Sequence, residues 1–171
     1  MDVNTFPVSP YNTILFCTDF SENADFAFDY AIDAARRRPG CVLYLLHVIP
    51  EPDAQFWKTY LYEVEDIDDK AKHDIDALLQ ERYLPRIPAG VDFRAEMCIG
   101  RDYLKILEFA REKQVDLIVM GRQGRGSIEK MLFGNVTERV ARKAECAVLV
   151  VPLTVKSRGA KRAGQPAKPS E

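Results

Sequence analysis

The stretch TILFCTDFSENADFAFDYAIDAARRRPGCVLYLLHVI, residues 13–49, decides the fold. It begins and ends with nearly continuous apolar runs, Thr13–Thr18 and Cys41–Ile49, which are typical of strands buried on both faces. Between them, apolar residues recur at spacings of one, three and four, which predicts a helix from about Glu22 to Arg38 with Ser21 as its N-cap. The stretch therefore predicts two parallel strands joined by a right-handed helical crossover.

The same alternation continues along the rest of the chain. Further strands are predicted at Val91–Ile99, Asp116–Met120 and Ala147–Val151, and further helices at about Phe56–Tyr83, Asp102–Glu112 and Val136–Ala144, with a short helical turn near Ile128–Leu132. The first of these strands alternates apolar and polar residues, which indicates an edge strand. Alternating strands and helices imply an α/β fold of three layers, with an open five-stranded parallel sheet between helices.

Length and charge limit the classes of protein that fit. The 171 residues suit one domain, which we expect to span residues 1–155. The 24 lysines and arginines nearly balance 26 acidic residues, so a broadly basic nucleic-acid-binding surface is not expected. Residues 156–171 hold five bases and one acid, and we expect a disordered tail there, with contact to an acidic partner or nucleic acid as the alternative.

The sequence also suggests a cellular setting. No run approaches the roughly 18 apolar residues of a membrane span. The first residues lack the pattern of a secretory signal, so we expect a cytoplasmic protein. Its four cysteines, Cys17, Cys41, Cys98 and Cys146, form no C-x-x-C pair, and we expect buried thiols, with a redox-sensing thiol left open.

One strand alone is followed by a glycine-rich segment. The strand Asp116–Met120 runs into GRQGRG, which holds three glycines, and a further glycine, Gly134, precedes the last predicted helix. In open parallel sheets, ligands bind beyond the carboxyl ends of the strands. Glycines let the backbone approach an anion, and a helix start supplies free N–H groups. Asn135 and Thr137 can bind phosphate there or cap the helix, and the glycines can equally serve tight turns.

Several familiar nucleotide sites are missing. The chain has no G-x-x-x-x-G-K-[ST], which excludes a P-loop NTPase, and no G-x-G-x-x-G follows the first strand. The phosphate loop of flavodoxins is absent from the same place. A response-regulator receiver would need a neighbouring acidic pair and a lysine after the last strand, where this chain has Pro152.

The glycine spacing Gly121-x2-Gly124-x9-Gly134 resembles the ATP-binding signature of the universal stress protein family. The segments ILFCTDFSENADFAFDYA, LLHVIP, DLIVMGRQGRG and AVLVVP resemble that family in the same order, from Tyr11 to Pro152. The resemblance implies the Rossmann-like fold of the adenine nucleotide α-hydrolases, with strand order 3-2-1-4-5. It also implies a homodimer formed through the fifth strand, Ala147–Val151.

The resemblance further implies roles for individual residues. Those expected around the adenosine are Thr18, Asp19, Val48, Met120 and Gly121, and those expected at the phosphates are Gly124, Gly134, Asn135, Val136 and Thr137. Arg125 would add a cation to the glycine loop. The family pattern prefers serine or threonine at the position of Asn135, which can donate an N–H but offers no hydroxyl.

The resemblance therefore implies a dimeric stress-response regulator that binds ATP or a related adenine nucleotide (ADP or AMP), with Mg²⁺ left open. No catalytic residue is assigned, because Asp19 is the only acid expected in the cleft and nucleotide recognition accounts for it. His47 is expected to be a packed histidine at the end of a buried strand. Two alternatives stay open: a nucleotide-free interaction protein and a slow ATPase.

Overall fold

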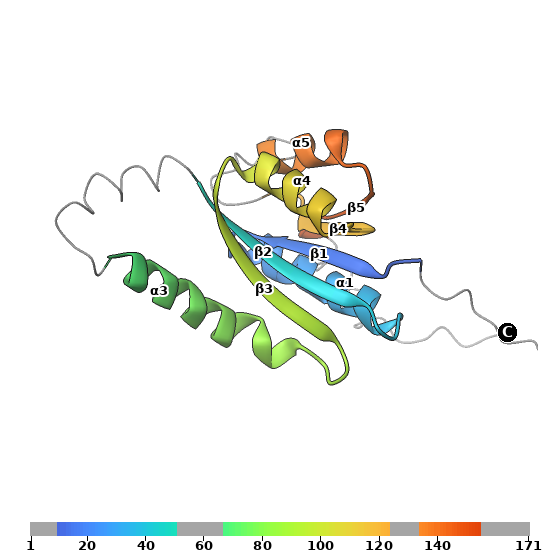
Figure 1. The fold of residues 1–171 in the computed structure, drawn as a ribbon, viewed down its shortest axis with the longest axis horizontal. Helices are drawn as coiled ribbons and strands as arrows, with labels where there is room; N and C mark the ends of the chain where they lie inside the picture. The colour runs from blue at the N-terminus through green and yellow to red at the C-terminus, as the bar shows by residue number, and fades with distance from the viewer. Residues whose placement is uncertain (1–9, 51–66, 124–133, 155–171) are drawn as a thin grey trace, which may run out of the picture.

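A computed structural model describes residues 10–50, 67–123 and 134–154, and its centre is a five-stranded parallel sheet (Figure 1). The strands are β1 (Thr13–Thr18), β2 (Val42–Pro50), β3 (Asp92–Gly100), β4 (Leu117–Gly121) and β5 (Ala147–Val151). They lie in the order β3-β2-β1-β4-β5, and every neighbouring pair is parallel. This confirms the predicted α/β class and the strand order, and no strand end differs from its prediction by more than one residue.

Helices cover both faces of the sheet, as predicted. One face carries α1 (Glu22–Arg36) and α3 (Ile67–Arg82), and the other carries α4 (Asp102–Glu112) and α5 (Asn135–Lys143) (Figure 1). A short 3₁₀ helix, η1 (Leu84–Arg86), follows α3. The start of the helix predicted from Phe56, the turn predicted near Ile128–Leu132 and the tail from residue 156 lie outside the described residues.

The alternation of side chains along β1 explains why its sequence is apolar throughout. Ile14 and Phe16 are fully buried in a cluster with α1 and α3, whereas Leu15 and Cys17 belong to a second cluster with α4 and α5. Because both faces of the sheet are covered, successive residues of the strand are buried in turn. Alanines such as Ala27 let α1 pack closely on β1 and β4.

The two edges of the sheet differ in character. β3 is the outer strand on one side, which confirms the prediction from its alternating sequence, and its Ile99 is 49% exposed. β5 is the outer strand on the other side, with Ala147 and Leu149 exposed. At the amino end of the sheet, the Asp116 carboxylate accepts the N–H groups of Asn12 and Thr13 at 2.8 and 3.0 Å.

The cysteines are free thiols at two depths. Cys17 and Cys41 are buried as predicted, whereas Cys98 and Cys146 are half-buried. Burial raises the pKa of all four thiols. Within the described part of the chain, no helix has both the length and the apolar character needed to cross a membrane.

Candidate functional site

A pocket of about 280 Å³ opens at the carboxyl ends of β1, β2 and β4. This is the end of the sheet at which open α/β folds bind ligands, and the volume lies near the lower limit of ordinary small-molecule sites. The lining residues come from these strand ends and from the starts of the helices. They are Cys17, Thr18, Asp19, Ser21, Ala24, Leu46, Val48, Asp102, Ile106, Met120, Gly121, Gln123, Gly134, Asn135, Val136 and Thr137.

The pocket gathers nearly all the residues that the sequence singled out. Nine of them line it: Thr18, Asp19, Val48, Met120, Gly121, Gly134, Asn135, Val136 and Thr137. The other two, Gly124 and Arg125, lie outside the described residues. Residues far apart in the sequence therefore share one cavity, although a role in binding stays a prediction for each.

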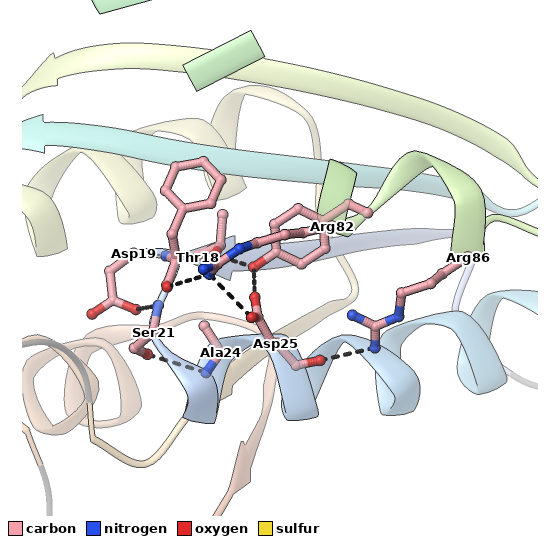
Figure 2. Close-up of polar contacts among 9 residues, drawn as sticks. Thr18, Asp19, Ser21, Ala24, Asp25, Arg82 and Arg86 are labelled. Atoms are coloured by element: carbon pink, nitrogen blue, oxygen red, sulfur yellow. Dashed lines mark hydrogen bonds and ion pairs between the residues drawn. The ribbon is translucent and has the colours of Figure 1, made fainter. Parts of the chain in front are cut away.

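The turn after β1 presents two polar side chains to the pocket. Asp19 accepts the backbone N–H of Ser21 at 3.1 Å through one carboxylate oxygen (Figure 2). The Ser21 hydroxyl accepts the N–H of Ala24 at 3.2 Å, which confirms the predicted cap of α1. The cap ties this turn to the first turn of α1, so both side chains have defined positions on the pocket wall.

The hydroxyl of Thr18 forms hydrogen bonds to other residues of the protein. It lies 2.6 Å from the hydroxyl oxygen of Tyr83 and accepts the N–H of Phe20 at 2.9 Å. His47 Nδ1 donates to the Thr18 carbonyl at 2.9 Å, and the His47 ring packs on Phe20 with centroids 4.7 Å apart. Thr18 therefore shapes the pocket floor, and His47 packs as the sequence led us to expect.

Gly121, where β4 ends, is in close contact with α1. A Cβ atom at this position would lie 3.0 Å from Asn23 Cγ and 3.1 Å from the Asn23 carbonyl group. The buried Asn23 amide donates to the Val151 carbonyl at 2.8 Å and accepts the Gln123 N–H at 3.0 Å. Gly121 is thus required for packing as well as being a candidate nucleotide contact, and Asn23 fixes the course of the chain that leaves β4.

The start of α5 is held against the end of β4. Gly134 donates its N–H to the Arg122 carbonyl at 2.9 Å, and Thr137 donates its hydroxyl to the Gly121 carbonyl at 2.9 Å. Gly134 is the N-cap residue, so Asn135 is the first residue of the helix and the capping role considered for Asn135 and Thr137 is wrong. The N–H groups of the first turn have no acceptor within the helix and carry its positive dipole end.

Seven of the sixteen lining residues were not predicted as site residues, and two of these seven come from a helix that the sequence had not connected with the site. Asp102 and Ile106 come from the first turns of α4, which packs on β2 and α5. Asp102 lines the same pocket as Asp19, so the expectation of a single acid in the cleft is wrong. The sequence signal was Gly100-Arg101-Asp102, a glycine that ends the third strand just before a helix start. Gly100 has φ +152°, which favours glycine.

The pocket thus combines an apolar wall with two kinds of polar group. Leu46, Val48, Ile106, Met120 and Val136 provide surfaces against which a flat ring can pack. The carboxylates of Asp19 and Asp102 can accept hydrogen bonds from hydroxyl groups, and the start of α5 suits an anion. In the described ranges, no three His, Cys, Asp or Glu side chains come together as a metal site.

Known proteins with similar sequences and structures include several universal stress proteins. A universal stress protein of Methanocaldococcus jannaschii is 32% identical over 146 residues, which cover 82% of each chain. The universal stress protein UspA from Lactobacillus plantarum has a TM-score of 0.68 at 27% identity, covering 82% of this chain and 97% of its own. A universal stress protein in complex with cAMP has a TM-score of 0.52 at 25% identity, covering 83% of this chain and 97% of its own.

The match to the family reaches every strand of the sheet. The model of the universal stress protein family covers residues 10–152, from the residues before β1 to the end of β5. That span includes the turn after β1 and the start of α5, which both line the pocket. The chain belongs to the universal stress protein family.

Proposed function

We propose that the protein binds an adenine nucleotide, ATP or its products ADP and AMP, in this pocket and acts as a dimeric stress-response regulator. The observation that carries the proposal is the meeting of an apolar wall, the Asp19 carboxylate and the start of α5 in one cavity. A related universal stress protein in complex with cAMP supports the adenine nucleotide as the ligand class.

Each part of the nucleotide matches a part of the pocket. The adenine ring would pack against Val48 and Met120, and the ribose hydroxyls would donate to Asp19. The phosphates would accept the N–H groups at the start of α5, where Asn135 can add a side-chain N–H. Gly124 and Arg125 belong to the proposed phosphate site from the sequence alone.

Titration calorimetry with ATP, ADP, AMP and cAMP, each with and without Mg²⁺, tests the proposal. We expect saturable binding of at least one of these nucleotides by the wild-type protein. Gly134→Val should abolish that binding, because side-chain bulk at the cap would occupy the space of the phosphates. The circular-dichroism melt of the variant shows that it is folded. Absence of binding at millimolar nucleotide would overturn the proposal.

Native mass spectrometry of the purified protein separates this function from the nucleotide-free alternative. A co-purifying mass equal to that of a nucleotide favours the binder. A slow ATPase gains one observation in its favour, because Asp102 is a second carboxylate that could orient a water molecule. Phosphate release that falls in both Asp19→Asn and Asp102→Asn would support that second function.

Dimerisation through β5 is part of the proposal. β5 is an outer strand of the sheet, paired with β4 on one side, and it exposes Ala147 and Leu149. An outer strand with apolar side chains is a natural surface for a second copy. The cytoplasmic location expected from the sequence stays a prediction.

A further inference from the structure

A single bulky residue in the turn after β1 has an unusual backbone. Phe20 has φ +59°, in the left-handed region of the backbone that residues other than glycine and asparagine rarely adopt. It lies between two pocket-lining residues, Asp19 and Ser21, yet it is itself 4% exposed and does not line the pocket. Whatever holds Phe20 in this conformation also sets the directions of its two neighbours.

The backbone of Phe20 is bonded on both sides of the residue. Its N–H donates to the Thr18 hydroxyl at 2.9 Å. Its carbonyl accepts an N–H from Arg82 Nη1, at the end of α3, at 2.7 Å. The same Arg82 nitrogen lies 3.1 Å from the carboxylate of Asp25 in the first turn of α1 (Figure 2). The guanidinium group of Arg82, from a helix far away in the sequence, thus bonds to the carbonyl of Phe20, the residue with the unfavourable backbone conformation.

A chain of hydroxyl groups holds the other side of the turn. Tyr83 donates its hydroxyl hydrogen to Asp25 Oδ1 at 2.5 Å, because a carboxylate can only accept. The Tyr83 oxygen is then the acceptor for the Thr18 hydroxyl at 2.6 Å, and Thr18 in turn accepts the Phe20 N–H. The hydrogen bonds therefore run in one direction, from Phe20 through Thr18 and Tyr83 to Asp25.

The aromatic rings fix the side chain of Phe20 as well. Its centroid is 4.7 Å from His47 and 6.0 Å from Tyr83. Tyr83 is fully buried and packs against Phe28 with centroids 4.8 Å apart. Residues about sixty positions later in the sequence thus contact the carbonyl and the ring of Phe20 directly, and they reach its N–H through Thr18.

We infer that Arg82 and Tyr83 are positioning residues of the pocket, which keep Phe20 left-handed so that Asp19 and Ser21 stay on the pocket wall. For nucleotide affinity this inference rests on the proposed function. Neither residue lines the pocket, so Arg82 acts through Phe20 and Tyr83 acts through Thr18 and Phe20. Without them the turn relaxes toward an extended backbone, and the carboxylate and hydroxyl lose their places in the cavity.

The first test removes one hydroxyl group. Tyr83→Phe keeps the packed ring and deletes the hydrogen bonds to Thr18 and Asp25. Tyr44→Phe is the matched control, because Tyr44 is also buried and its hydroxyl accepts from Arg94 away from the pocket. In calorimetry with ATP we expect affinity to fall about tenfold in Tyr83→Phe and to change less than about twofold in Tyr44→Phe.

The second test compares two substitutions of Arg82, of which only one keeps a positive charge. Arg82→Met removes the donor to the Phe20 carbonyl and should weaken ATP binding about as much as Tyr83→Phe. Arg82→Lys keeps a cationic donor on a long side chain and should recover most of the lost affinity. A purely structural role predicts lower melting temperatures with unchanged affinity. Wild-type affinity in both Tyr83→Phe and Arg82→Met would therefore overturn the inference.

An NMR experiment without nucleotide keeps this inference separate from the proposed function. A residue with positive φ gives a strong intraresidue NOE between its amide and α protons. We expect this NOE at Phe20 in the wild type and in Tyr44→Phe, and its loss in Tyr83→Phe and Arg82→Met. If the wild type binds no nucleotide, the proposed function fails and the NOE alone decides the inference. Persistence of the NOE in both variants would contradict it.

Discussion

Gly121 of β4 lies so close to Asn23 of α1 that a methyl group on the glycine would be 3.0 Å from the Asn23 side chain. The contact joins the strand that precedes the candidate phosphate site to the helix that begins at the candidate nucleoside site. Both residues also help to place the chain that leaves β4, since Asn23 bonds to Gln123 and Gly121 bonds to Thr137.

Gly121→Ala should destabilise the fold. The new methyl group would meet the backbone and side chain of Asn23, and a packed helix cannot withdraw without loss of other contacts. Overpacking of this kind costs about 1–3 kcal/mol of unfolding free energy. Urea denaturation followed by circular dichroism measures the change. A variant as stable as the wild type would show that α1 can shift freely.

Asn23→Ala should lower both stability and nucleotide affinity. The substitution removes the Asn23 acceptor of the Gln123 N–H, at a cost of about 1–3 kcal/mol, and one of the two donors to the Val151 carbonyl, which keeps its bond from the Arg122 N–H. Because Gln123 lines the pocket, we also expect weaker ATP binding in calorimetry.

Asp116→Ala is the control for Asn23→Ala. It too removes a side chain that bonds to two backbone groups, the N–H groups of Asn12 and Thr13. These lie at the amino end of the sheet, opposite the pocket. The variant should therefore lose stability and keep the wild-type affinity. Equal loss of affinity in both variants would mean that global stability alone controls binding.

Because of Tyr83, we expect the stability of the protein to fall as the pH rises in the alkaline range. Burial, followed by the hydrogen bond to Asp25, raises the pKa of Tyr83 above its ordinary value of 10.0. The unfolded chain therefore loses this proton first as the pH rises. The stabilisation is complete below about pH 10 and is lost above it, at up to about 1.4 kcal/mol per pH unit.

Thermal melts of the wild type and Tyr83→Phe at about pH 9 and about pH 11 measure this effect. Other tyrosines and the lysines titrate in both proteins, so the difference between the two isolates Tyr83. The wild type should lose more stability than the variant over this interval. A parallel loss in both proteins would contradict the shifted pKa.

The resemblance of particular segments made much of the site predictable, and tertiary contacts account for the rest. Thr13–Thr18 and the Ser21 cap are local patterns, and the structure reproduces both. In the sequence, Asn23 looks like any polar residue in the first turn of a helix. Its role could not be predicted, because its bonds to β5 and to Gln123 span a hundred residues or more. The contact between Tyr83 and Thr18 spans 65 residues and leaves no signal in either segment.

The proposed dimer predicts that the two edges of the sheet respond differently to charge. Leu149→Lys places a cation on the exposed face of β5, where Leu149 is 36% exposed, and should yield a monomer. Ile99→Lys is the matched control on β3, where Ile99 is 49% exposed, and should leave the dimer intact. Light scattering after size exclusion measures both masses. Dissociation by Ile99→Lys alone would place the interface at β3.

The proposed orientation of the nucleotide predicts that variants at its two ends lose affinity in different ways as the number of phosphates in the ligand changes. Asp19→Ala removes an acceptor for the ribose, which ATP, ADP and AMP share, so their affinities should fall by the same factor, about tenfold. Asn135→Ala removes a donor at the start of α5, where the phosphates would lie, so ATP should lose more affinity than AMP.

Calorimetry with the three nucleotides gives this pattern directly, and Val48→Ala provides a comparison on the adenine wall. Its effect should be uniform, as for Asp19→Ala, because the adenine is also common to all three ligands. If Asp19→Ala instead weakened ATP far more than AMP, Asp19 would lie at the phosphate end, where a carboxylate can favour binding only through a bound cation, and the orientation proposed for the nucleotide would have to be reversed.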